Sequence, residues 1–308
     1  MQAPDPQRRE PASPWGMGAG TRMPVESGPP GAPTEARLLH LGGRPGAWGS
    51  LGLWGDAPDY WGACAALACA VGRAAGVQPG DRVLSVACGA GEELRLWSRH
   101  FRAGRVLGVE LHPARVAAAA RALAGWPGVT VCTGSATALG ALLLPSQGYD
   151  RVLCVDAAYH LRPRSAFLQA AFHLLRPGGT LAYTDLLLEG QRAPWQTLLL
   201  RVAALACGVP PDDLLDEAGQ LQRLRAAGFV QPRLQRLDDA VLGGFTDFVQ
   251  AQTLRHGQGS WHPAWRRVAL TARLIPTCRA AGLGYVMVSA TRPAEAAAAA
   301  PSIAAATA

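Results

Sequence analysis

Two glycines and one glutamate have a spacing that suits a nucleoside ligand. Gly89 and Gly91 follow an apolar run and open a helical stretch, so bare backbone and a helix N-terminus face the ligand. A dinucleotide fingerprint has a third glycine where this chain has Leu94. Glu110 stands about 20 residues past the turn, where a carboxylate can accept both hydroxyl groups of a ribose. The spacing therefore predicts a nucleoside with a short extension that lacks a diphosphate.

Acidic and imidazole side chains follow two later apolar runs. Asp156 and His160 come after the run that begins at Tyr149, and Asp185 lies near the end of the next run. Open α/β sheets bind their ligands outside the carboxyl ends of the strands, so we expect these side chains near the ligand. A neutral imidazole can remove a proton near pH 7, which makes His160 a candidate general base. A surface position or support of the ligand is the alternative for His160.

Apolar runs and helical stretches alternate through the middle of the chain. The expected strands are 82–88, 105–110, 129–133, 149–156 and 180–187, and the expected helices are 59–76, 92–101, 113–124 and 164–175. This alternation is typical of βαβ units and of a parallel sheet with both faces covered. After Gly190 the pattern loosens into a helix at 214–227, an extended run at 231–237, a helical insertion at 245–281 and a last strand at 284–290. The predicted fold is a doubly wound, mostly parallel Rossmann-like α/β sheet with a helical cap inserted before the last strand.

Five motifs in this order resemble the class I S-adenosylmethionine-dependent methyltransferases. They are Val83-Leu-Ser-Val-Ala-Cys-Gly-Ala-Gly91, Gly108-Val-Glu-Leu111, Gly134-Ser-Ala-Thr-Ala-Leu139, Tyr149-Asp-Arg-Val152 and Leu174-Leu-Arg-Pro-Gly-Gly179, and together they span about residues 80–190. Gly52-Leu-Trp54 and Gly284-Tyr-Val-Met-Val-Ser-Ala290 resemble the small-molecule branch, which includes sugar, polyketide and phosphobase enzymes. The resemblance implies S-adenosylmethionine as cofactor and methyl transfer to an oxygen or nitrogen of a small or lipid-like molecule.

The resemblance also implies roles for individual residues. In similar enzymes a histidine at the position of His160 acts as the general base, with an aspartate at the position of Asp185 nearby. Trp54 is expected to cover the methionine end of the cofactor. The cofactor-binding residues that the motifs imply are Trp54, Ser85, Ala87, Gly89, Gly91, Glu110, Leu111, Ser135, Ala136 and Asp156.

Three positions depart from the family pattern. Ser85 stands where the family usually has an aspartate that helps to anchor the methionine ammonium, and Ala87 stands where it usually has glycine. Ser135 replaces a frequent aspartate near the adenine, although its hydroxyl can still accept a hydrogen bond. These changes predict weaker cofactor affinity. They also motivate the alternative function, a catalytically silent protein of this fold that acts as a binding or scaffold partner.

Composition and local patterns exclude several other classes of protein. Among 308 residues, 17% are charged and 49% hydrophobic, which excludes wholesale disorder. Every basic residue other than histidine is arginine, so no Schiff-base lysine or P-loop lysine exists. Seven cysteines form no CxxC pair, and no metal site is expected. Asp156-Ala-Ala-Tyr159 resembles the Asp-Pro-Pro-Tyr motif of enzymes that methylate nucleic acids, but it lacks both prolines, so we expect no nucleic-acid partner.

The chain is expected to form one domain with unpacked ends. Residues 1–48 are rich in Pro and Gly and are predicted to be disordered, as is the Ala-rich tail at 291–308. The cofactor-binding part is 49–192, and 193–290 hold the lid, the cap and the final strands. No transmembrane run or secretory signal is present, so a cytoplasmic location is expected. The stretch that opens with Trp261 and Trp265 has three interpretations: an amphipathic helix packed on the sheet, a cap over the acceptor site, or a helix that lies on a membrane.

Overall fold

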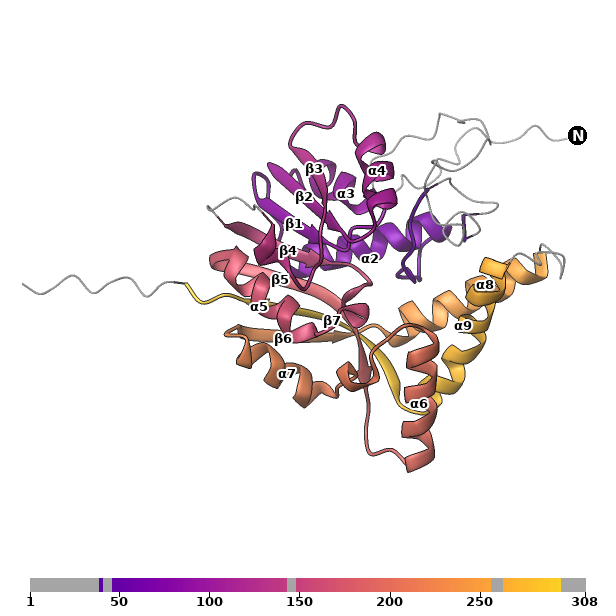
Figure 1. Ribbon diagram of the computed structural model, residues 1–308. Helices are drawn as coiled ribbons and strands as arrows, with labels where there is room; N and C mark the ends of the chain where they lie inside the picture. Colours follow the sequence, from indigo (N-terminus) through magenta and orange to yellow (C-terminus); the bar gives the residue numbers. More distant parts are fainter. Residues whose placement is uncertain (1–38, 41–45, 143–147, 256–262, 295–308) are drawn as a thin grey trace, which may run out of the picture.

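The computed structural model describes residues 39–40, 46–142, 148–255 and 263–294 (Figure 1). Residues 1–38 and 295–308, most of the two expected unpacked ends, lie outside the described residues. Ala47 and Trp48 fall in the segment expected to be disordered, but they are only 7% and 3% exposed. The indole of Trp48 meets that of Trp61 edge to face, with ring centroids 6.3 Å apart. The packed chain therefore begins before residue 49.

A seven-stranded sheet has the order β3-β2-β1-β4-β5-β7-β6. The strands are β1 (Arg82–Val86), β2 (Arg105–Glu110), β3 (Val129–Thr133), β4 (Tyr149–Cys154), β5 (Leu175–Leu188), β6 (Val230–Arg236) and β7 (Leu283–Thr291). Strands β1 to β5 pair in parallel, and β7 runs antiparallel between β5 and β6. The strand order reverses between β1 and β4, which is the switch point where such sheets bind ligands.

Helices cover both faces of this sheet. They are α2 (Tyr60–Ala74), α3 (Glu92–Arg99), α4 (Pro113–Ala122), α5 (Arg164–Leu174), α6 (Pro194–Ala206), α7 (Glu217–Ala226), α8 (Gly244–Arg255) and α9 (Pro263–Ala280). Successive side chains of a strand point to opposite faces. Val83 accordingly joins the apolar cluster formed with α2, α3 and α4, whereas Leu84 joins the cluster formed with α5 and α7. The doubly wound Rossmann-like architecture is thus confirmed.

Local sequence signals explain where several helices begin. Asp59 caps α2 by accepting a hydrogen bond from the Gly62 amide at 2.7 Å, and Asp216 caps α7 through the Gly219 amide at 2.8 Å. Proline occupies the first turn of α4, where its missing N–H group is not needed. The expected boundaries of these three helices lie within three residues of the observed ones.

Two elements differ from expectation. Helix α6 was not predicted, because its apolar residues lie on several sides: Leu200 is buried, while Trp195, Leu198, Val202 and Leu205 are exposed. Strand β5 begins at Leu175, five residues before the expected start, because Leu175 already pairs with Tyr149 across a register shift.

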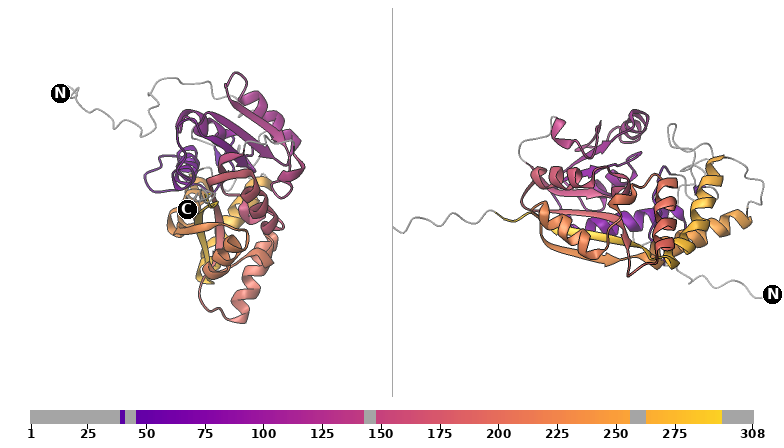
Figure 2. Two further views of the ribbon diagram at one scale, coloured as in Figure 1. Left: turned by 90° about the vertical axis from the view of Figure 1, so that its left-hand side faces the viewer. Right: turned by 60° about the horizontal axis from the view of Figure 1, so that its bottom comes forward.

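Helices α6, α8 and α9 gather at one end of the sheet (Figures 1 and 2). This cap contains the expected insertion, since α8 and α9 lie between β6 and β7 in the chain. Trp265 of α9 is 6% exposed, which favours packing over contact with a membrane, whereas Trp261 lies outside the described residues. None of the helices in the described ranges is long and apolar enough to cross a membrane.

Candidate functional site

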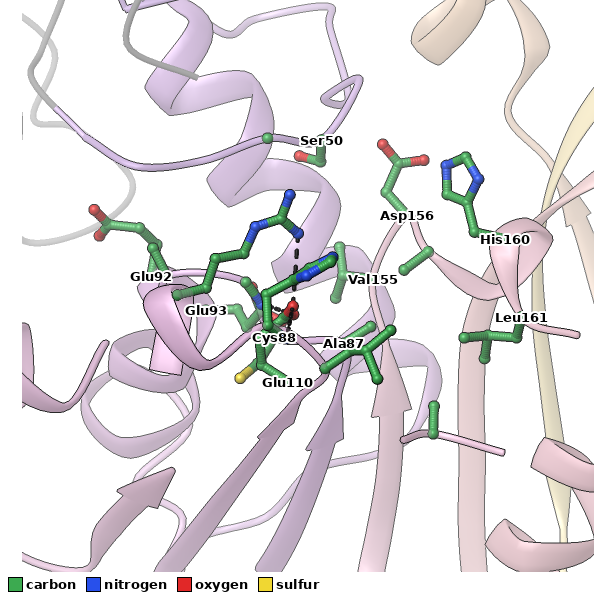
Figure 3. Close-up of a pocket in the computed structure, with 18 of the residues that line it drawn as sticks. Ser50, Ala87, Cys88, Glu92, Glu93, Glu110, Val155, Asp156, His160 and Leu161 are labelled. Atoms are coloured by element: carbon green, nitrogen blue, oxygen red, sulfur yellow. Dashed lines mark hydrogen bonds and ion pairs between the residues drawn. The ribbon is translucent and has the colours of Figure 1, made fainter. Parts of the chain in front are cut away.

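A cavity of about 580 Å³ opens where β1, β2 and β4 end, a size suited to a small-molecule ligand. Figure 3 shows Glu93 and Glu110 on one side of it and Asp156 and His160 on the other. Among the residues expected at the cofactor, it is lined by Ala87, Gly89, Glu110, Leu111, Ser135, Ala136 and Asp156. His160 also lines it, but in the described structure Trp54, Ser85, Gly91 and Asp185 do not.

The turn after β1 exposes backbone to this cavity. Gly89 has a φ of 56°, and a Cβ atom there would meet nothing within 4 Å, so the site leaves open space above the turn. Gly91 serves another purpose, because a Cβ atom there would come within 3.1 Å of the Ala119 side chain on α4. Ala87 also adopts a left-handed φ of 56°, which costs a residue with a Cβ atom about 1–2 kcal/mol. The turn therefore keeps a glycine-type backbone at a residue that is not glycine.

The carboxylate of Glu110 is held at the end of β2. Its Oε2 accepts the Gly89 amide at 3.0 Å, its Oε1 accepts the His112 amide at 3.0 Å, and Arg115 lies 3.6 Å from Oε1. Glu110 is 3% exposed, so its position is fixed by these contacts. A carboxylate has about four lone-pair positions, which leaves acceptor capacity for hydroxyl groups in the cavity.

The neighbouring wall is less polar. Leu111 is 58% exposed although it lines the cavity, and Ala136 is buried there. The hydroxyls of Ser135 and Thr137 lie 2.9 Å apart, and Ser135 Oγ also accepts the Thr137 amide at 3.3 Å. This wall combines an apolar surface with a hydroxyl pair, which suits a flat heterocycle with polar edges.

Residues 46–51, called here the closing segment, span the cavity. The Ala47 amide donates to Glu92 Oε1 at 3.0 Å on α3, and the Leu51 amide donates to Asp156 Oδ2 at 2.5 Å beyond β4. Trp48 and Ser50 line the cavity from this segment, and Ser50 appears above it in Figure 3. Trp48 Nε1 and Ser50 Oγ are buried with no hydrogen-bond partner among the described residues, so two residues that line the cavity carry unpartnered polar atoms.

Trp54 lies away from the cavity that it was expected to cover. Its ring stacks on Phe248 of α8 with centroids 4.7 Å apart, and its amide donates to the Ala240 carbonyl at 2.7 Å. Trp54 Nε1 donates to the Leu51 carbonyl at 2.9 Å. Trp54 therefore fastens the closing segment to the cap, and Trp48 is the tryptophan at the cavity.

Sequence reasoning missed Glu93, which lies in the first turn of α3. Glu93 is 7% exposed and lines the cavity, and Ser85 Oγ donates to its Oε1 at 3.3 Å. Ser85 itself is fully buried behind this carboxylate. A helical signal was available, because Glu93 and the apolar Trp97 are four residues apart and share one face of α3.

Asp156 is held by two tyrosine hydroxyls and one backbone amide from three parts of the chain. Its Oδ1 accepts the hydroxyl of Tyr159 at 2.8 Å and that of Tyr285 on β7, and its Oδ2 accepts the Leu51 amide. The Tyr285 hydroxyl oxygen also lies 2.9 Å from Thr184 Oγ1, whose hydroxyl can donate to it. Burial raises the pKa of Asp156, and the three hydrogen bonds to its carboxylate oppose that rise. Asp156 thus joins the closing segment to β4 and β7.

A second, largely apolar cavity of about 430 Å³ adjoins the first. Gly49, Asp156, Tyr159 and His160 line both cavities, and α6 and α9 supply much of the remaining wall. His160 is exposed, and its Nδ1 lies 3.2 Å from the Gly208 carbonyl. Because a carbonyl oxygen only accepts, this contact places the hydrogen on Nδ1 and leaves the Nε2 of a neutral ring free as a base.

Asp185 is not at the site. It is fully buried, and its carboxylate accepts hydrogen bonds from Arg164, from Gln220 Nε2 at 2.9 Å and from the Leu186 amide at 2.7 Å. The expected pairing with His160 is absent from the described structure, because Arg164 of α5 occupies the carboxylate. No group of three or more side chains that could hold a metal ion occurs in the described ranges.

Known proteins match the part of the chain that contains the strands and turns of the first cavity. The family described as "Methyltransferase domain" matches residues 83–179. Erythromycin 3''-O-methyltransferase of Saccharopolyspora erythraea is 30% identical over 214 residues, which cover 66% of this chain and 68% of that protein.

Two solved structures share the fold at lower identity. The structure of the 4+2 cyclase SpnF matches with a TM-score of 0.63 and 21% identity over 87% of this chain and all of that one. Mycolic acid cyclopropane synthase CmaA1, solved with SAH and CTAB, matches with a TM-score of 0.67 and 17% identity over 83% of this chain and 93% of that one.

Proposed function

Because the chain belongs to the class I S-adenosylmethionine-dependent methyltransferase family, we propose that it methylates an oxygen or nitrogen of a small apolar or lipid-like molecule. The observation that carries the proposal is the pair of adjoining cavities, one lined by carboxylates and one largely apolar, with His160 in the wall of both. The first cavity suits the cofactor and the second suits the acceptor.

The first cavity has the charge and the donor set that this cofactor requires. Four carboxylates line it, from Glu92, Glu93, Glu110 and Asp156, against the two arginines Arg115 and Arg162. The bound cofactor supplies a methyl group on a positively charged sulfonium, and an excess of carboxylates favours that charge. Glu110 would accept the ribose hydroxyls, while Leu111, Ser135 and Ala136 would contact the adenine. The unpartnered polar atoms of Trp48 and Ser50 remain for the amino-acid end.

The second cavity supports an apolar acceptor. Leu186 of β5, Leu200 of α6 and Ile275 of α9 are among the side chains that line it. A pocket lined mainly by apolar residues with a few polar groups binds small molecules by their apolar surface and orients them by the polar groups. The polar groups here are those of Asp156, Tyr159 and His160, and they lie where the two cavities meet.

Of the two possible acceptor atoms, oxygen and nitrogen, the position of His160 favours the oxygen of a hydroxyl group. A hydroxyl must lose its proton when it attacks a methyl group, whereas a neutral amine attacks through an existing lone pair. The free Nε2 of His160 can take that proton, while alignment of the acceptor is left to the walls of the second cavity. The similarity to a 3''-O-methyltransferase supports the same assignment.

The proposal is tested by binding and then by transfer. Calorimetry should show that the protein binds S-adenosylmethionine. With methyl-labelled cofactor, label should appear on hydroxylated macrolides or lipid alcohols, and less on matched amines. Tight cofactor binding without label on any acceptor would contradict the enzyme function and favour the silent scaffold that the Ser85 and Ala87 departures suggested.

Replacing Glu110 by glutamine should weaken S-adenosylmethionine binding about 30-fold, or about 2 kcal/mol, because two ribose hydroxyls lose a charged acceptor. Calorimetry measures the affinity, and the melting temperature shows whether the turn at Gly89 is intact. Glu217→Gln, an exposed glutamate on α7, is the matched control and should bind as the wild type does. Unchanged affinity in Glu110→Gln would show that the ribose lies elsewhere.

A further inference from the structure

Glu93 is a buried carboxylate for which the fold offers no positive partner. In the described part of the chain its side chain forms no ion pair, and its only side-chain donor is the hydroxyl of Ser85 at 3.3 Å. An ionised carboxylate in such a place is costly unless something positive approaches it. Since Glu93 lines the first cavity, a ligand in that cavity can supply the charge.

A chain of hydrogen bonds orients this carboxylate. Trp97 Nε1 donates to Ser85 Oγ at 3.3 Å, and Ser85 Oγ in turn donates to Glu93 Oε1. The serine hydroxyl can do both because it accepts and donates at once. Ser85 therefore lies directly behind the carboxylate, at the strand position where the family resemblance implies an aspartate.

Among the described residues, the charged side chains that affect Glu93 most strongly are acidic. Glu92 lies beside it on α3, Glu110 faces it from β2, Cys88 from the turn and Cys154 from β4. Burial, reinforced by the two neighbouring glutamates, raises the pKa of Glu93 to about 8. In the protein without ligand the carboxyl is therefore mostly protonated at pH 7, and a cationic ligand shifts it to the ionised form.

We propose that Glu93 replaces the acid missing at position 85 and binds the α-ammonium group of the cofactor's amino-acid end. The inference rests on the proposed function, since it needs the cofactor in this cavity. Ser50 supports it independently, because this residue of the closing segment lines the same cavity and its buried hydroxyl has no partner among the described residues, which suits a polar ligand end. In this arrangement Glu93 on helix α3 supplies the acid, instead of a residue on strand β1, and Ser85 positions it.

Binding should accordingly release a proton. The empty carboxyl holds its proton until the pH approaches 8, and the ammonium favours the ionised form, so Glu93 loses a proton as the ligand enters. Affinity for S-adenosylhomocysteine, which carries the same ammonium, should rise about tenfold from pH 6 to pH 7. Calorimetry in buffers of different ionisation enthalpy should count close to one proton released per ligand at pH 7.

Three variants test whether Glu93 binds the ammonium group in place of an acid at position 85. Glu93→Gln should bind S-adenosylhomocysteine about 10- to 100-fold more weakly at pH 8 and release no proton. Ser85→Asp alone should bring no gain, because two adjacent carboxylates share one proton. The double variant Ser85→Asp with Glu93→Gln should recover most of the lost affinity, since the acid returns to the strand. Glu217→Gln, the exposed control on α7, should keep both the affinity and the proton release.

The outcomes distinguish failure of the proposed cofactor site from failure of the Glu93 assignment. A wild type that does not bind S-adenosylhomocysteine would overturn the cofactor site and the Glu93 assignment with it. A wild type that binds, with Glu93→Gln equal in affinity and proton release, would overturn the assignment alone. Melting curves check the fold of each variant. If Glu93→Gln does not fold, a gain in affinity for Ser85→Asp would show that the ammonium had lacked an acid, and would also overturn the assignment.

Discussion

Replacing His160 by alanine should lower turnover by about 10²- to 10⁴-fold, the range expected for loss of a general base. The imidazole is exposed at the junction of the two cavities. Its Nδ1 donates to the Gly208 carbonyl, which leaves Nε2 without a hydrogen and able to accept a proton. Affinity for S-adenosylmethionine should change little, because the base acts on the acceptor. Single-turnover rates with a hydroxyl acceptor, measured across pH, provide the test, and the rise of rate with pH should disappear in the variant.

His173→Ala is the matched control. His173 also places its Nδ1 near a backbone carbonyl, at 2.7 Å from Gln169, but it lies on α5 and outside both cavities in the described structure. It should turn over as the wild type does. If His160→Ala retains normal turnover, or loses activity only because S-adenosylmethionine no longer binds, His160 is not the base.

Replacing Asp185 by alanine should destabilise the protein by about 3–5 kcal/mol, because Arg164 is left as a buried charge without its partner. Both side chains are fully buried, and Gln220 would lose its acceptor as well. Denaturant unfolding measures the loss. The folded fraction at low temperature should keep the wild-type dependence of rate on pH, which separates a structural role from the catalytic role expected from the sequence.

The double variant Arg164→Met with Asp185→Leu should recover much of this stability, since apolar side chains often replace a buried ion pair without loss. A single Asp185→Ala variant as stable as the wild type would contradict the structural role. If Asp185→Ala alters the pH profile in the same way as His160→Ala does, Asp185 acts together with His160 in catalysis, although the structure does not pair them.

The sheet could be predicted from the sequence because its signals are local. Alternating apolar runs, Gly and Pro turns, and caps such as Asp59 each lie within a few residues of the element they define. Helix α6 was missed because apolar side chains on several of its sides give no single periodic face. The outer face of α6 is exposed, so packing against the core does not require its apolar residues to lie on a single face.

The candidate site was predictable only where one turn and one strand end determine it. Gly89 and Glu110 are of that kind, since neighbouring parallel strands bring them together. Trp54 was expected at the cofactor and Trp48 in the disordered segment, because the actual positions depend on the path of the closing segment and on a ring from α8. Asp185 was misplaced for the same reason: Arg164 meets it across 21 residues of sequence.

Tyr285 links the site to the order in which the ribosome makes the chain. Among the described strands β7 comes last along the chain, yet it pairs with β5 and β6, and its Tyr285 contacts Asp156 and Thr184. A nascent chain that ends before Leu283 leaves β6 without the strand that pairs with it in the described sheet, and Asp156 without one of its donors. The closing segment contacts Asp156 through the Leu51 amide, so its attachment is complete only when β7 has supplied Tyr285. Firm binding of the cofactor should therefore require β7 as well as the segments that line the cavity.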